Sequence, residues 1–77
     1  MARNLDKALP YPQAGNVAFF QTLMDQTDEY IGVDSTSDKT IGLWHILAMA
    51  HDYCSDQGID FDATLAEVRE QLDLERG

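Results

Sequence analysis

The sequence has little cysteine, few basic residues and no long apolar run. Its one cysteine, Cys54, excludes an internal disulfide bond. No apolar segment reaches the roughly 18 residues that a membrane-spanning helix needs, and no N-terminal apolar run resembles a signal peptide. With 77 residues the chain has room for one small domain, not for two domains or a βα barrel. These absences predict a cytoplasmic protein that does not bind membranes.

Basic residues are scarce: 5 Lys and Arg stand against 14 Asp and Glu, which gives a net charge of −9. Residues 1–12 hold two bases and one acid (+1), whereas residues 13–77 hold three bases and 13 acids (−10). Such a charge repels phosphates and disfavours direct binding to nucleic acid. It favours partners with a basic surface, although acidity that only maintains solubility is the simpler alternative.

Apolar residues recur at helical spacing in three segments, and no segment alternates in the manner of a β-strand. The predicted helices span residues 17–31, 38–57 and 61–73. Before them, Pro10 and Pro12 favour an extended path over residues 1–15, which form either a frayed terminus or an arm that docks on the helices or on a second subunit. We therefore expect an all-α fold: a three-helix domain at 16–77 with an extended N-terminal arm at 1–15.

The predicted helix ends rest on capping residues. Asn16, Ser37 and Asp60 are suitable N-caps, because their side chains can accept hydrogen bonds from the first free amides of each helix. Gly32 and Gly58 are suitable terminators, because glycine readily adopts the left-handed conformation that ends many helices.

The second predicted helix is apolar on most sides, which is typical of a helix that is buried on most sides. Two neighbouring helices of this length do not cover it, so we predict a homodimer that buries it through Trp44, Leu47, Ala48 and His51. Burial by the N-terminal arm in a monomer is the alternative. The predicted core is Phe20, Leu23, Met24, Leu43, Trp44, Leu47, Ala50, Phe61, Leu65 and Val68, although Trp44 could instead be an exposed contact residue.

The residues that could carry chemistry cluster at His45, His51, Asp52 and Cys54. His51 and Cys54 are three residues apart and could share a metal ion, but a tetrahedral site needs four ligands, which only a symmetric dimer would supply. Cys54 lacks a suitably placed base for nucleophilic catalysis. The glycines are scattered and form no phosphate-binding loop. We therefore expect no cofactor and no enzymatic activity.

Residues 43–72 combine an apolar helix, a Gly58-Ile59-Asp60 corner and an amphipathic helix. This stretch resembles the C-terminal helix pair of MazG-like all-α nucleoside triphosphate pyrophosphohydrolases. The resemblance implies a helical hairpin over these residues. The family's magnesium-binding Glu and Asp would fall on Gly42 and His45, so both ligands are missing and the resemblance does not extend to the activity. As a short, acidic, helical chain the protein is also similar in type to phage or mobile-element accessory proteins.

Three functions remain open. The first is an acidic protein-binding module, of the kind of a phage inhibitor or DNA mimic, that occupies the basic surface of a nucleic-acid-binding enzyme. Its carboxylates would form two edges: Asp25, Asp28, Glu29, Asp34 and Asp38; and Glu67, Glu70 and Asp73. The second is a self-associating structural or regulatory homodimer without catalytic activity. The third is a degenerate pyrophosphohydrolase-like or metal-binding protein.

Overall fold

The computed structural model describes residues 12–76. They form three helices: α1 (Gln13–Ile31), α2 (Lys39–Gln57) and α3 (Phe61–Arg76). These residues contain no β-strand. The predicted all-α, three-helix class is therefore confirmed.

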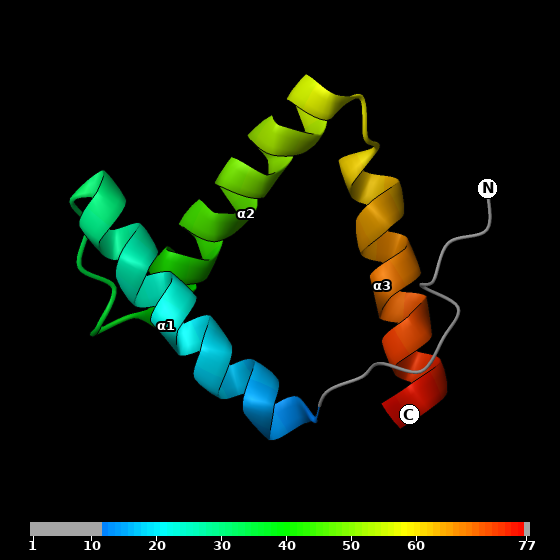
Figure 1. The fold of residues 1–77 in the computed structure, drawn as a ribbon, viewed down its shortest axis with the longest axis horizontal. Helices are drawn as coiled ribbons and strands as arrows, with labels where there is room; N and C mark the ends of the chain where they lie inside the picture. Colours follow the sequence, from blue (N-terminus) through cyan, green and yellow to red (C-terminus); the bar gives the residue numbers. More distant parts are fainter. Residues whose placement is uncertain (1–11, 77) are drawn as a thin grey trace.

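The helices form an open arrangement. Figure 1 shows α1 crossing the N-terminal half of α2, while α3 turns back from the other end of α2. Helix α2 contacts both neighbours, but α1 and α3 do not contact each other. The Cα atoms extend over 38 × 31 × 16 Å, and the short dimension is little more than the thickness of two crossed helices.

Helix α1 begins earlier than the sequence predicted. Pro12 is its N-cap in an extended conformation, and the amide of Asn16 donates to the Pro12 carbonyl at 3.1 Å. Asn16 therefore lies inside the helix, and its prediction as N-cap is wrong. Proline has no amide to satisfy and its restricted φ suits a helix start, so the chain turns helical directly after it. Residues 13–15 thus belong to α1 rather than to an arm. Of the rest of the predicted arm, Pro12 is extended and residues 1–11 lie outside the described residues.

The other two helix starts depend on aspartate. Asp38, not Ser37, caps α2, because its carboxylate accepts from the amide of Thr40 at 3.0 Å. The predicted Ser37 cap is therefore wrong by one residue. Asp60 caps α3 as predicted, and it accepts from the amide of Ala63 at 2.9 Å.

Two helix ends follow the prediction and the third does not. Gly32 and Gly58 end α1 and α2 in the left-handed conformation, with φ of 74° and 70°. Helix α3 continues to Arg76, beyond the predicted end at residue 73. Arg76 in the last turn interacts favourably with the helix dipole, and Gln71 donates to Glu75 at 2.7 Å across one turn.

The described residues bury very little. Met24, which is 6% exposed, is their one buried hydrophobic side chain. Of the predicted core, Phe20, Leu23, Ala50 and Phe61 are half-buried. The remaining members are exposed: Leu43, Trp44, Leu47, Leu65 and Val68. The core prediction is wrong for these five, because the helices splay apart and leave their apolar faces without neighbours.

Candidate functional site

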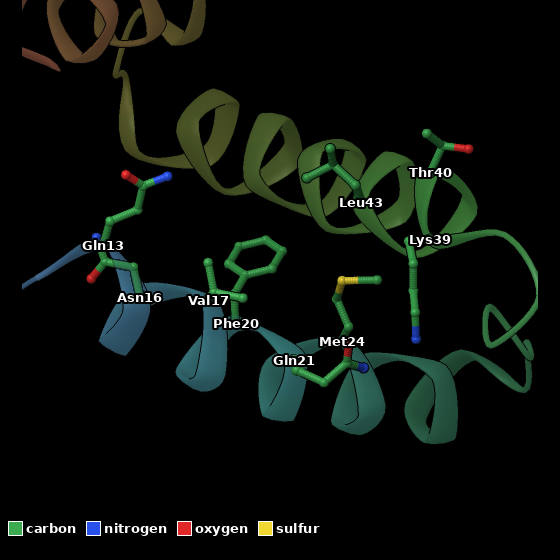
Figure 2. Close-up of a pocket in the computed structure, with 9 residues that line it drawn as sticks. All are labelled: Gln13, Asn16, Val17, Phe20, Gln21, Met24, Lys39, Thr40 and Leu43. Carbon is green, nitrogen blue, oxygen red and sulfur yellow. The ribbon is translucent and has the colours of Figure 1, made fainter. Parts of the chain in front are cut away.

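An apolar groove of about 460 Å³ lies between α1 and α2. Figure 2 shows Val17, Phe20 and Met24 pointing from α1 towards α2. Leu43 lines the same groove from α2, and Lys39 reaches down towards α1 at one end. The other lining residues are uncharged and polar: Gln13, Asn16, Gln21 and Thr40. The groove can accept an apolar side chain.

The outer side of α2 is a second uncovered apolar surface. It carries the four predicted oligomer residues, of which Trp44 (65% exposed), Leu47 and His51 are exposed and Ala48 is half-buried. A shallow depression of about 340 Å³ adjoins Trp44. The Trp44 ring stands edge-on to His45 with centroids 5.0 Å apart, which helps to fix its orientation.

The histidines and the cysteine of α2 have different neighbours. His51 makes an edge-on ring contact with Phe61 at 5.5 Å and lies 3.7 Å from Asp52, Nδ1 to Oδ1. Cys54 is half-buried. Within residues 12–76 no group of three or more histidines, cysteines or carboxylates is placed to hold a metal ion.

The first predicted acidic edge divides into two kinds of residue. Asp25 and Glu29 are exposed on α1, and Gln21 donates to Asp25 at 3.0 Å. Asp28, by contrast, is half-buried and accepts from both the amide and the hydroxyl of Ser35, at 3.0 and 2.7 Å. Asp28 therefore ties the end of α1 to the loop that follows it.

Asp34 and Asp38 also organise this loop. Asp34 accepts from the Thr36 hydroxyl at 2.7 Å and from its amide at 2.9 Å. Asp38 makes the same pair of bonds with Thr40. In each case the hydrogen bond from the threonine hydroxyl is the larger cause, and that from the threonine amide the smaller, of a carboxyl pKa below its usual value of 3.8. At Asp34 the positive charge of Lys39 lowers the pKa further. Both carboxylates remain exposed and negative at neutral pH.

The second acidic edge lies on α3. Glu67, Glu70 and Asp73 are exposed and follow one another at intervals of three residues. Glu70 projects from the side opposite to Phe61, since nine residues make two and a half turns of the helix, and Glu67 and Asp73 flank it. Both edges thus present carboxylates to solvent, but the structure does not place them on one continuous surface.

One packing contact was missed by the sequence analysis. Gly42 is buried in the crossing of α1 and α2, against Met24 and Ser35. A glycine within an otherwise apolar helix was the available signal, because it often marks a close approach of two elements. The contact leaves no room for a side chain at position 42.

None of the described helices combines the length and the hydrophobicity required to span a membrane. The sequence matches no protein-family model, and neither a curated protein nor a solved structure is detectably similar to it.

Proposed function

We propose that the chain is an acidic protein-binding module that occupies a basic surface of a partner, such as that of a nucleic-acid-binding enzyme. The observation that carries the proposal is the set of exposed carboxylates on α1 and α3 in a chain of net charge −9. Charges of this sign and density attract a basic surface over several ångströms, which speeds association and selects against acidic partners.

The exposed carboxylates are spaced regularly. Asp25 and Glu29 are one helical turn apart, and Glu67, Glu70 and Asp73 are each just under one turn apart. Neighbours at such intervals lie about 5–6 Å from one another. A row of negative charges on a rigid helix can take the place of backbone phosphates at a basic surface, which is the basis of the inhibitor and DNA-mimic form of this proposal.

The hydrogen bonds of the loop refine the predicted contact residues. Asp28, Asp34 and Asp38 each accept bonds that hold the loop between α1 and α2. Substituting them would alter the fold as well as the charge. Asp25 and Glu29 on α1 and Glu70 and Asp73 on α3 are therefore the residues at which binding is best tested.

The test is capture of binding proteins from a cell lysate on the tagged chain, with washes at about 50 mM and about 500 mM salt. The edge variant combines Asp25→Asn, Glu29→Gln, Glu70→Gln and Asp73→Asn. Two further exposed pairs supply a control that removes the same charge: Asp52→Asn and Asp56→Asn on α2 with Asp62→Asn and Glu75→Gln on α3.

We expect one basic, nucleic-acid-handling protein to bind at low salt and to be released at high salt. The edge variant should lose it, while the control of equal net charge should keep it. Binding that survives high salt, or that both variants lose equally, would show that the two edges are not the recognition surface.

A further inference from the structure

Most of the outer side of α2 is left uncovered by the rest of the chain, and its His51 end meets Phe61 of α3. Helix α1 packs against the Gly42 side of α2, and Trp44 lies about 200° around the helix from Gly42. Helix α3 diverges from α2 after the corner, where Phe61 contacts His51. Trp44 therefore remains 65% exposed, although a side chain of this size is among the most favourable to bury.

The residues of this side follow the spacing of a helix-pairing surface. Ile41, Trp44, Ala48 and His51 recur at intervals of three, four and three residues, which is the pattern of the seam between two paired helices. Leu47 adjoins this row and is 38% exposed. The depression next to Trp44 provides a hollow for a side chain of a facing helix.

The same stretch is free of acidic residues. From Lys39 to His51 the sequence contains no Asp or Glu, whereas acids occur throughout the rest of α2 and in both other helices. A partner recognised by its basic charge would be expected to face carboxylates. A second copy of this chain, which also has a net charge of −9, would instead be repelled by carboxylates. It could therefore approach most closely at this acid-free stretch of α2.

The exposure and the stability of the single chain also indicate a partner of this kind. Three of the large exposed hydrophobic residues, Ile41, Trp44 and Leu47, lie on this side of α2 and are 40%, 65% and 38% exposed. With one buried hydrophobic side chain in residues 12–76, the chain gains too little from burial to offset the entropy of ordering three helices.

We infer that α2 is a self-association surface, and that two copies of this chain pair through the row formed by Ile41, Trp44, Ala48 and His51, with Leu47 beside it. Pairing supplies each α2 with the second layer of helices that its own chain does not provide. The row is separate from the acidic edges, so the inference does not depend on the proposed basic partner.

The test measures mass and fluorescence on the full chain. Sedimentation should give twice the 8.6 kDa of one chain. Trp44 is the single tryptophan, so its emission should shift to shorter wavelength as the protein concentration rises and the indole leaves water. The thermal midpoint should also rise with concentration, because association stabilises only the folded chain.

Two matched variants locate the surface. Trp44→Glu and Tyr53→Glu each place the same charge at an exposed aromatic residue of α2, and the two residues are 65% and 63% exposed. Tyr53, however, lies on the side of Gly42, because eleven residues are close to three full turns of the helix. Trp44→Glu should weaken pairing at least about thirtyfold, and Tyr53→Glu should leave it unchanged.

The inference is overturned by a single-chain mass at high concentration together with a midpoint that does not depend on concentration. It is equally overturned by a dimer that tolerates Trp44→Glu, because another surface would then form the contact. If Trp44→Glu fails to fold, the concentration dependence of the wild-type midpoint still decides whether the chain associates, and Ala48→Glu tests the same row with a smaller change.

Discussion

Gly42 of α2 lies directly against Ser35 of the preceding loop. A Cβ atom at position 42 would be 2.7 Å from the Ser35 Oγ and 3.2 Å from its Cβ. Ser35 is 2% exposed, and Asp28 holds both its amide and its hydroxyl, so it has no room to retreat. The crossing of α1 and α2 therefore depends on the absence of a side chain at position 42.

Gly42→Ala is expected to destabilise the protein despite the better helix propensity of alanine. The gain in propensity is about 1 kcal/mol, whereas forcing a methyl group into a close contact costs roughly 1–3 kcal/mol. Urea unfolding at a fixed protein concentration measures the difference. Gly15→Ala is the control, because its nearest neighbour, the Pro12 Cγ, is at 3.5 Å and leaves room for the methyl group. If Gly42→Ala stabilised as much as Gly15→Ala, the close contact would not exist in solution.

Asp28→Ala is expected to lower stability by about 1–3 kcal/mol, because it leaves the buried Ser35 amide and hydroxyl without their acceptor. Asp28→Asn should cost less, since the amide oxygen can still accept. Glu29→Ala provides the comparison at the neighbouring exposed acid. Chemical unfolding of the three variants distinguishes a structural role of Asp28 from a role of its charge alone. If only the charge mattered, the Asn and Ala variants would be equally stable.

The start of α2 should be sensitive to acid. The Thr40 hydroxyl and amide lower the Asp38 pKa in the folded chain, and Thr36 does the same for Asp34. Because the pKa is lowered in the folded chain, each carboxylate stabilises the fold at pH values above its usual pKa of 3.8. This stabilisation is lost as the pH falls through 3.8 and below the lowered pKa. Circular dichroism between about pH 6 and about pH 2 should show helix loss in this range.

Asp38→Asn separates capping from titration. Asparagine is a good N-cap and does not titrate, so this variant should keep the helix while reducing its loss on acidification. Asp56→Asn is the control, because Asp56 is an exposed acid near the other end of α2 and caps no helix start. Equal acid sensitivity of Asp38→Asn and the wild type would contradict the assigned role of Asp38.

The sequence predicted most of the local structure, although two of the three N-caps were wrong, and it did not predict the packing. Some predictions depend only on residues that are close together in the chain, and these are confirmed: the number of helices, the Asp60 cap, and the helix ends at Gly32 and Gly58. Burial depends on how helices approach one another. Helical periodicity cannot distinguish a face covered by the same chain from one left open, so Trp44 and Leu65 were wrongly placed in the core.

The acidic residues show the same limit. The sequence grouped Asp28, Asp34 and Asp38 with Asp25 and Glu29 because all five share a charge and a region of the chain. In the structure, the carboxylates of Asp28, Asp34 and Asp38 accept hydrogen bonds that hold the loop, whereas Asp25 and Glu29 are exposed on α1. A sequence pattern records charge and spacing, but the partner of each carboxylate is set by the path of the loop.

Gly58→Ala is expected to weaken the corner between α2 and α3. Gly58 has φ of 70° and no atom within 4 Å of an added Cβ, so the cost is backbone strain rather than a clash. An alanine in the left-handed region costs about 1–2 kcal/mol, and Gly58→Asn should cost less because asparagine tolerates this conformation. The amides of Gly58 and Ile59 both donate to the Cys54 carbonyl, so unwinding of the corner would release both bonds. Thermal unfolding at one protein concentration should therefore rank the variants Gly, Asn, Ala in decreasing stability, and an alanine variant as stable as the wild type would show that the corner relaxes to a different turn.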